Sequence, residues 1–174
     1  GGYRWILENL SSQIIGVSHD VSNSLCEQIP SKRIKTLYNG IDIEALQQAA
    51  LTGTTNIRNE LKLPCDAKLI LGVGRISAQK DFASFARVAD RVCRANANAF
   101  FIIAGPKEEP DAVQQLEGEI KRLGLSNKLF ALGPRSDVPA LVAQSDAFLS
   151  TAIFEGQGIA ALEAMALTRP VVAM

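Results

Sequence analysis

The sequence predicts an α/β protein built on a mostly parallel sheet with helices on both faces. Short apolar segments alternate with helical segments, which is the order of βαβ units. The apolar segments at residues 69–71 and 100–103 are continuous, without polar alternation, as in parallel strands covered on both faces. The composition, 47% hydrophobic and 21% charged, is typical of a folded protein.

The first part of the chain predicts a short βαβ unit and a linker. The expected elements are a strand at 13–17, a helix at 21–28 and a strand at 33–38. Ser18 or Asp20 is available as the N-terminal cap of the helix. Asn39-Gly40 is a turn signal. Residues 43–55 are rich in alanine and glutamine and then in threonine and glycine, and we interpret them as a linker between two domains.

The rest of the chain predicts a regular alternation. The expected strands are 68–73, 99–104, 128–132, 147–150 and 170–173, and the expected helices are 82–93, 110–123, 138–144 and 158–167. Apolar residues recur at helical spacing in the first of these helices. Gly124 marks the end of the second helix, and Asp137 is a plausible N-cap of the third, with Pro139 in its first turn.

Charge and composition exclude several classes of function. Lys plus Arg and Asp plus Glu both number 18, so the chain lacks the basic excess of a general nucleic-acid or acidic-membrane binder. No apolar run approaches the roughly 18 residues that span a bilayer. One histidine, His19, and scattered cysteines do not make a zinc site, and His19 has no pattern of a triad base.

The cysteines and the chain ends carry two further expectations. Cys26, Cys65 and Cys93 form no CxxC pair and are expected to be reduced, partly buried thiols of a cytoplasmic protein. The chain begins with glycine and ends on the apolar run 170–174, which predicts a buried strand. We therefore expect a piece of a longer protein, truncated at both ends.

The turns that follow the predicted strands are the expected place of a ligand site, since open parallel sheets bind ligands outside the carboxyl ends of their strands. Glycines recur in these turns, where the backbone must turn tightly or approach a ligand. The turns contain Gly72, Gly74, Arg75 and Lys80 after the first strand, Gly105-Pro106-Lys107 after the second, Gly133-Pro134-Arg135-Ser136 after the third, and 150–158 after the fourth.

The residue types in these turns predict binding of an anion that carries sugar hydroxyls. Arg75, Lys80 and Arg135 are cations, and residues 156–158 precede a helix N-terminus, whose free N–H groups favour phosphate. Glu155 and Glu163 lie before and within that same helix. Carboxylates do not bind phosphate, but they accept hydrogen bonds from vicinal hydroxyls. The combination indicates a nucleotide.

Each signal has a plainer interpretation that the residues alone leave open. Residues 72–77, GVGRIS, nearly match the dinucleotide motif GxGxxG, but a simple βα turn explains them equally well. Arg75 and Lys80 alone could be solvated surface cations. Glu163 alone could be an exposed position of an ordinary helix.

Taken together, the motifs resemble family 4 of the retaining nucleotide-sugar glycosyltransferases, which have the two Rossmann-like domains of the GT-B architecture. The sharpest is residues 155–163, EGQGIAALE, an E-x7-E motif that continues into Ala164-Met165-Ala166 and Pro170-Val171-Val172. The others, covering nearly the whole chain, are Ile15-Gly16-Val17-Ser18, Tyr38-Asn39-Gly40-Ile41-Asp42, Val73-Gly74-Arg75 with Lys80-Asp81, Ile103-Ala104-Gly105, Leu132-Gly133 and Ser145-Asp146.

The resemblance implies a domain assignment and residue roles. Residues 1–48 would end the N-terminal acceptor domain with its crossover, and residues 49–174 would form the donor-binding domain, incomplete at its C-terminus. Arg75, Lys80 and Glu155 would be catalytic. The two cations would stabilise the leaving diphosphate in place of a metal, and Glu155 would hold the transferred sugar.

The resemblance also implies a set of donor-binding residues. Glu163 would accept hydrogen bonds from the ribose, and residues 135–137 would border the base. The full set is Gly74, Arg75, Lys80, Arg135, Glu155, Gly156, Gln157, Gly158, Ile159 and Glu163. Gln157 departs from the family pattern, because an aromatic or apolar residue is common there, and Thr168 replaces a frequent glycine.

The implied activity is retaining sugar transfer from a UDP, GDP or ADP sugar to a glycan, lipid or small molecule, as in polysaccharide biosynthesis. No cofactor and no metal are expected. The acceptor would bind the missing domain, so this chain alone is expected to be inactive. The parent is expected in the cytoplasm, with contact to the cytoplasmic membrane face left open. The alternatives are a nucleotide-sugar epimerase or phosphorylase of the same architecture, a non-catalytic transferase-like subunit, or a generic nucleotide-binding domain.

Overall fold

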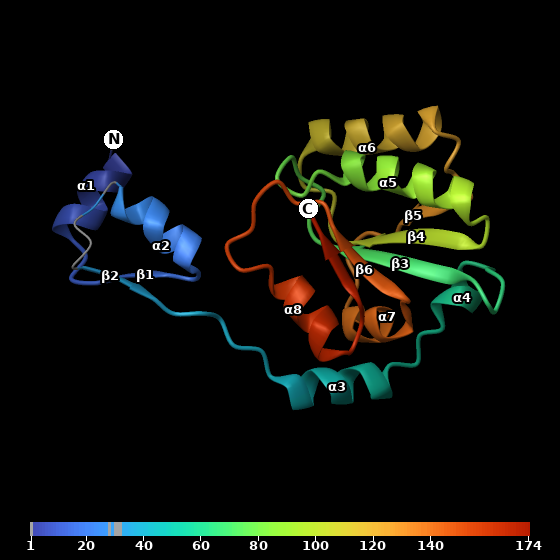
Figure 1. Cartoon of the computed structure of the whole chain (residues 1–174), viewed down its shortest axis with the longest axis horizontal. Helices are drawn as coiled ribbons and strands as arrows, with labels where there is room; N and C mark the ends of the chain where they lie inside the picture. The colour runs from blue at the N-terminus through green and yellow to red at the C-terminus, as the bar shows by residue number, and fades with distance from the viewer. Residues whose placement is uncertain (1, 28, 30–32) are drawn as a thin grey trace. The chain divides into compact units, whose positions relative to one another are not determined.

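The computed structural model describes residues 2–27, 29 and 33–174. The chain divides into two compact units (Figure 1). The first unit holds the residues up to Ile41 together with Glu155–Ile159, and the second holds Asp42–Phe154 and Ala160–Met174. The expected site residues are therefore distributed over both units.

The described residues of the first unit form two parallel strands and two helices. Its elements are α1 (Gly2–Asn9), β1 (Ile14–Gly16), α2 (His19–Cys26) and β2 (Ile34–Thr36). Ile14 of β1 pairs with Ile34 of β2. Ser18 caps α2, as predicted, because its hydroxyl accepts the Val21 N–H at 3.2 Å. The sequence analysis did not predict α1.

The second unit is a parallel five-stranded sheet with the strand order β5-β4-β3-β6-β7. The strands are β3 (Lys68–Val73), β4 (Ala99–Ala104), β5 (Leu129–Ala131), β6 (Ala147–Ser150) and β7 (Val171–Ala173). The helices are α3 (Ile43–Thr52), α4 (Ile57–Glu60), α5 (Phe82–Ala95), α6 (Pro110–Arg122), α7 (Val138–Gln144) and α8 (Ile159–Ala166), whose first residue groups with the first unit. The predicted α/β fold is confirmed, with most bounds within two residues.

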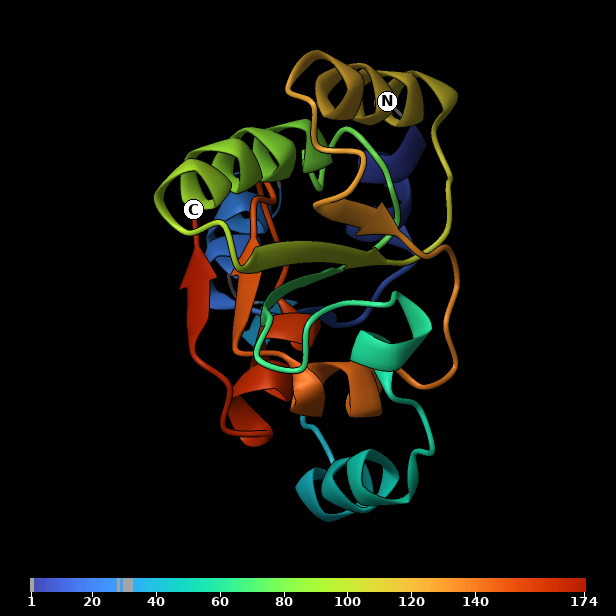
Figure 2. The same ribbon diagram turned by 90° about the vertical axis from the view of Figure 1, so that its right-hand side faces the viewer.

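Helices cover both faces of this sheet (Figures 1 and 2). Helices α5 and α6 lie on one face, and α7 and α8 lie on the other. Each face has its own hydrophobic cluster. Phe85 and Phe101 centre the first, with their rings edge to face at 5.5 Å, and Leu71, Leu141 and Phe148 belong to the second. The β4 strand is buried along its whole length, which explains its continuous apolar sequence.

The predicted linker at 43–55 was wrong, because most of it is helix α3. Asp42 caps this helix by accepting the Ala45 N–H at 2.9 Å. Alanine, leucine and glutamine are strong helix formers, and Leu46 and Ala50 pack against the hydrophobic cluster of the second unit. Only the end of the segment, from Gly53 onward, is an extended loop. The glycine and threonine residues therefore indicated a loop correctly for residues 53–55 but not for the rest of the segment.

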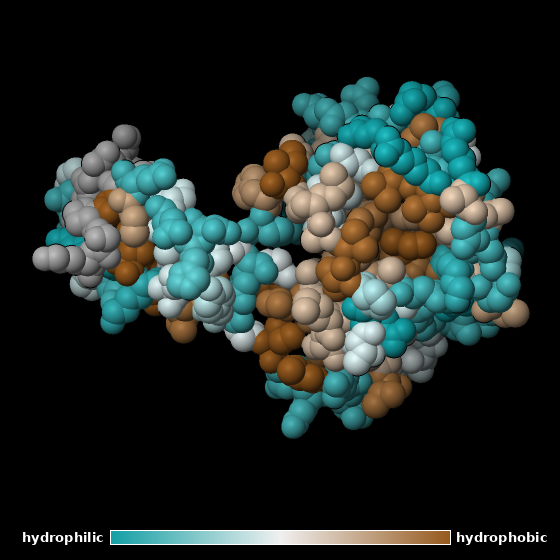
Figure 3. All heavy atoms as spheres, viewed as in Figure 1, coloured by the Kyte–Doolittle hydropathy of each residue, from teal (hydrophilic) through white to brown (hydrophobic). Residues whose placement is uncertain are grey.

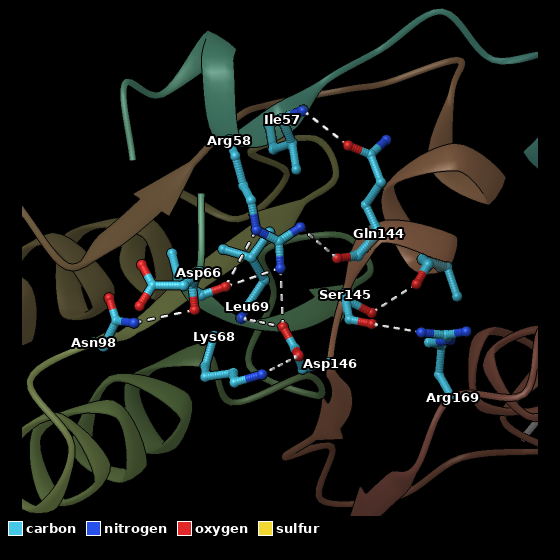
Figure 4. A network of polar contacts seen from close by, with 12 residues as sticks. Ile57, Arg58, Asp66, Lys68, Leu69, Asn98, Gln144, Ser145, Asp146 and Arg169 are labelled. Carbon is cyan, nitrogen blue, oxygen red and sulfur yellow. Dashed lines mark hydrogen bonds and ion pairs between the residues drawn. The ribbon is translucent and has the colours of Figure 1, made fainter. Parts of the chain in front are cut away.

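A polar network fastens α4 to the amino ends of β3 and β6 (Figure 4). The Arg58 guanidinium bonds to the Ala67 carbonyl at 2.8 Å and to the Asp146 carboxylate at 3.1 Å. Asp146 also accepts the Leu69 N–H at 2.9 Å. Burial raises the pKa of Asp146, but the Leu69 N–H and Lys68 outweigh it and hold the pKa below its usual range. Asp146 thus joins two neighbouring strands at the end opposite the expected ligand site.

The three cysteines differ in exposure. All three are free thiols. Cys93 is half-buried and donates to the Ala99 carbonyl at 3.4 Å. Cys26 and Cys65 are exposed, so the expectation that all three are partly buried was wrong. Cys26 is the last residue of α2 and Cys65 lies in a turn, and neither position is on a packed face.

Hydrophobic side chains also reach the surface of the second unit (Figure 3). A groove of about 210 Å³ lies beside the edge strand β7, between Val88 and Val92 of α5 and Val172 of β7. Val172 is 57% exposed. Among the described residues, none of the helices has both the length and the hydropathy to cross a bilayer.

Candidate functional site

The strand order places the candidate site at the carboxyl ends of β3 and β6. From β3 the chain first builds β4 and β5 on one side, and it then crosses over to build β6 and β7 on the other. The crevice at such a reversal is where open α/β sheets bind ligands. The loops that leave this point are residues 74–81 after β3 and 151–158 after β6. Both loops carry residues predicted from the sequence.

Lys80 reaches back over the end of β3. A Cβ built on Gly74 would lie 2.8 Å from Cε of Lys80 and 3.2 Å from its Cδ, so the lysine stem runs along the glycine backbone. Gly74 also adopts a φ of +153°, which other residues avoid. The structure therefore brings together two of the predicted donor-binding residues.

Arg75 points from the same turn and is paired with an acidic residue. Its Nη1 lies 2.8 Å from Oε1 of Glu108, and both side chains are exposed. The two loops that carry them are joined by the Ile76 N–H, which donates to the Pro106 carbonyl at 2.8 Å. An exposed pair of this kind contributes about 0–1 kcal/mol. Breaking this pair to free Arg75 for another anion would therefore cost little.

A cavity of about 260 Å³ opens beside Arg75. It lies at the carboxyl ends of β3 and β4 and against the loop after β5. Its lining is mostly apolar, with two arginines, and consists of Val73, Gly74, Arg75, Ala104, Gly105, Pro106, Pro134, Arg135 and Val138. Gly74, Arg75 and Arg135 of the predicted set therefore share one cavity.

Arg135 is held by two acidic residues. Its Nε and Nη2 donate to the two carboxylate oxygens of Asp137 at 2.8 and 2.7 Å, and its Nη1 and Nη2 donate to those of Glu60 at 2.8 and 3.1 Å. Hydrogen bonding from Arg135 holds the pKa of Asp137 well below its usual range, and Asp137 and Glu60 raise the pKa of Arg135. The guanidinium thus supports the cavity wall through its bonds within the protein.

Asp137 occupies the predicted N-cap position of α7 but does not cap the helix with its side chain. The carboxylate bonds instead to Arg135 and to the Thr55 hydroxyl. The predicted N-cap position is therefore confirmed, but the side chain forms no capping bond. The physical reason is that the guanidinium offers two parallel charge-assisted bonds, which are stronger than one bond to a helix N–H.

Glu163 lies half-buried on α8, and burial raises the pKa of its carboxyl group. Within the part of the chain that the structure describes, no hydrogen bond to this carboxylate is formed. A desolvated acceptor without a partner is costly to keep, which favours a functional role over that of an ordinary surface position. Its chemistry fits the hydroxyl acceptor that the sequence predicts.

The remaining predicted residues, Glu155–Ile159, group with the first unit. There Gln157 bonds twice to the main chain of Asn39, since its Oε1 accepts the N–H and its Nε2 donates to the carbonyl at 2.9 Å. A Cβ on Gly156 would lie 3.1 Å from Cγ2 of Val17. Gly158 has a φ of +70°, which favours glycine. Gln157 therefore secures the loop through main-chain contacts, a role that its sequence position did not indicate.

Two residues of the crevice were missed by the sequence analysis. Thr151, directly after β6, is buried and bonds to main-chain carbonyls of the loop after β3. Gln79 bonds to the loop after β6. A threonine at the end of a buried strand is a weak signal, because its partners lie about seventy residues earlier in the chain. No group of three or more His, Cys, Asp or Glu side chains suited to a metal ion occurs among the described residues.

Comparison with known families and proteins gives a consistent result. The profile of the family described as Glycosyl transferases group 1 matches residues 53–174. An uncharacterized glycosyltransferase of Methanocaldococcus jannaschii is 30% identical over 171 residues, which cover 93% of this chain and 42% of that protein. The UDP-Gal:alpha-D-GlcNAc-diphosphoundecaprenol alpha-1,3-galactosyltransferase of Escherichia coli is 27% identical over 158 residues, covering 87% and 40%.

The fold is also found in a solved structure. The crystal structure of Anabaena HepE in complex with UDP and glucose matches with a TM-score of 0.84 and 25% sequence identity, over 99% of this chain and 47% of that one. The chain therefore spans about half the length of the relatives it matches. The sheet and its flanking helices are those of a GT-B glycosyltransferase.

Proposed function

Since this chain belongs to the family of glycosyl transferases group 1, we propose that it holds the nucleotide-sugar donor site of a retaining family 4 enzyme. The observation that carries the proposal is the position of Lys80, whose stem crosses Gly74 beside Arg75 at the reversal point of the sheet. Two cations at that point suit a diphosphate.

The proposed reaction transfers a sugar from the diphosphate to an acceptor hydroxyl. The bond between the anomeric carbon and the phosphate oxygen breaks, and its electron pair goes to the diphosphate. The acceptor oxygen bonds to the anomeric carbon from the same face, and its proton passes to the departing phosphate oxygen. Arg75 and Lys80 stabilise the charge that grows on the diphosphate, which is the largest contribution in chemistry of this kind. No metal is required for this step.

The other residues of the site bind the donor in this proposal. The half-buried Glu163 accepts hydrogen bonds from the ribose, and Glu155 accepts them from the transferred sugar. The N–H groups of residues 156–159 lie beside the phosphates or the sugar. The apolar cavity between Arg75 and Arg135 takes the base, and the clamp of Arg135 by Asp137 and Glu60 keeps its wall in place.

A UDP sugar is the donor to test first. HepE was crystallised with UDP and with UDP-glucose, and the name of the E. coli relative contains a UDP sugar. GDP and ADP sugars also fit a site for a diphosphate and a ribose. In the proposal, the acceptor binds to a part of the enzyme outside this chain, so the chain alone binds donor without transferring sugar. We place the enzyme in the cytoplasm, in polysaccharide biosynthesis, with its acceptor a glycan, lipid or small molecule.

Calorimetric titration of the chain with UDP, GDP and ADP tests the proposal. Lys80→Met and Glu163→Gln should each weaken the preferred diphosphate about tenfold or more, the usual loss for a bond to a charged group. Lys121→Met removes a lysine at the end of α6 and is the matched control, for which binding should be unchanged. A folded chain that binds none of the three diphosphates, or that binds one equally well without Lys80, would contradict the proposal.

The enzyme alternatives are separable with the longer protein. An epimerase would convert the donor sugar without an acceptor, and a phosphorylase would require inorganic phosphate. A transferase should need an acceptor and release UDP in proportion to the sugar transferred.

A further inference from the structure

We infer that Thr151, together with Gln79, is a positioning residue that fixes the direction of Lys80 at the donor site. The inference rests on the proposed function, because it concerns the same site. Neither residue belongs to the predicted set of donor-binding residues. Both join the loop after β3, which carries Lys80, to the loop after β6, which leads to Glu155.

The Thr151 hydroxyl contacts two successive carbonyls. Its Oγ1 lies 3.1 Å from the Lys80 carbonyl oxygen and 3.0 Å from that of Asp81. A hydroxyl has one proton, so the two carbonyls share it in a three-centre bond. The residue is 4% exposed. The hydroxyl is therefore hydrogen-bonded to the main chain, and because it is buried a ligand cannot contact it.

Gln79 forms the second connection between the same loops. Its main-chain carbonyl accepts the Ile153 N–H at 2.9 Å, and its side-chain Nε2 donates to the Phe154 carbonyl at 2.9 Å. Three consecutive residues, 79–81, are thus bonded to residues 151–154. These bonds fix the position of the loop after β3 relative to the loop after β6.

The turn held in this way sets the direction of the lysine. Asp81 adopts a left-handed conformation with φ +43° and ψ +54°, which costs a residue with a side chain about 1 kcal/mol or more. Its carboxylate caps α5 by accepting the Ser84 N–H at 3.1 Å, and Thr151 holds its carbonyl from the other side. Because Lys80 immediately precedes this turn, the turn determines where its stem begins to cross Gly74.

Loss of the hydroxyl would affect the donor site through Lys80. In Thr151→Val the shape is kept, but the Lys80 and Asp81 carbonyls lose the hydroxyl, and the Asp81 carbonyl keeps the Ser84 and Phe85 N–H groups. The left-handed turn then loses one of its supports, and the lysine stem is held less firmly over Gly74. Thr151→Ser keeps the hydroxyl and should retain the position of the lysine.

A double-mutant cycle with UDP as the titrant tests this inference. We expect Thr151→Val to raise the Kd for UDP about fivefold or more, in line with one lost hydrogen bond, and Thr151→Ser to stay within about twofold. In a Lys80→Met background, Thr151→Val should change the Kd by less than about twofold, because its effect passes through the missing ammonium. Thr52→Val, which removes the hydroxyl bonded to the Gln48 carbonyl in α3, is the control and should leave the Kd unchanged.

Gln79→Leu gives an independent test if Thr151→Val fails to fold, which circular dichroism detects. It should also weaken UDP binding only when Lys80 is present. An equal effect of either variant in both backgrounds, or no effect in either, overturns the inference while leaving the proposed function intact. If the unmodified chain binds none of the three diphosphates, or binds its preferred one independently of Lys80, both fall together.

Discussion

The backbone of Gly74 approaches Gly105 so closely that a side chain at Gly105 would have no room. A Cβ built on Gly105 would lie 1.9 Å from the Gly74 carbonyl oxygen and 2.5 Å from its carbon. The contact is continued by the Gly74 N–H, which donates to the Ala104 carbonyl at 3.0 Å. The carboxyl ends of β3 and β4 are thus closed against each other beneath the proposed donor site.

Substitution of Gly105 by alanine should therefore destabilise the protein by about 3 kcal/mol or more. The Cβ meets backbone rather than a mobile side chain, and the φ of +155° adds strain. Urea unfolding followed by circular dichroism measures the loss. Gly118→Ala, on the exposed side of α6 with nothing within 4 Å of its Cβ, is the matched control and should instead stabilise by about 0.5–1 kcal/mol. Equal stability of the two variants would refute the prediction.

Glu163→Gln should stabilise the protein at neutral pH while weakening donor binding. Burial raises the pKa of this carboxyl, so the ionised form costs stability above its folded pKa, and the cost disappears once the pH falls below the ordinary pKa of glutamate. Because water still reaches the half-buried group, the gain should stay below about 1 kcal/mol. Thermal unfolding at several pH values measures it.

The control for this experiment is Glu117→Gln on α6, an exposed residue whose pair with Lys107 is also exposed. Its effect on the free energy of unfolding should be small at every pH. A gain for Glu163→Gln that persists with the same size in acid would show that the carboxylate carries no burial cost.

Asp137→Asn should lower the free energy of unfolding by about 2 kcal/mol at neutral pH, which is the usual contribution of a hydrogen bond to a charged group. Bonding to Arg135 holds the pKa of Asp137 well below its ordinary value. The stabilisation is therefore present above the ordinary pKa of aspartate and is lost as the pH falls through the folded pKa. The difference between Asp137→Asn and the unmodified chain should shrink in acid, and Asp66→Asn, an exposed control, should show no such trend.

The thiols should react in two phases with a chromogenic disulfide. Cys26 and Cys65 are exposed and should react rapidly. Cys93 should react slowly, because burial raises its pKa and reduces access, although Lys128 partly offsets the shift. Absorbance stopped-flow measures the phases, and Cys93→Ser should remove the slow one alone. Three equal rates would contradict the assigned burial of Cys93.

The parts of the fold that local sequence determines were predictable. Strands β3 and β4 have the predicted bounds, because each is a continuous apolar run that ends at a glycine. Helix α3 was misjudged, since Gly53 and its neighbouring threonines dominated the interpretation of a segment whose alanine and glutamine residues favour helix. Its packing against the core is a tertiary effect that composition does not show.

The candidate site was predictable in place but only partly in its contacts. The glycines and cations after the strands lie at one edge of the sheet, as predicted, because parallel strands all end there. The clamp on Arg135 was not visible, since Glu60 lies 75 residues away in the sequence. The same holds for Thr151, whose partners belong to a different loop. The residue roles stay predictions, to be tested by the titrations above.

The strand order also has a consequence for the way the chain emerges from the ribosome. Strands β3, β4 and β5 are synthesised first and can pair at once, but the other edge of β3 must wait for β6, residues 147–150. During that interval Ile70 and Leu71 present an open apolar edge to any neighbouring nascent chain. Translation that slows between β5 and β6 should therefore lower the soluble yield of this protein more than slowing elsewhere.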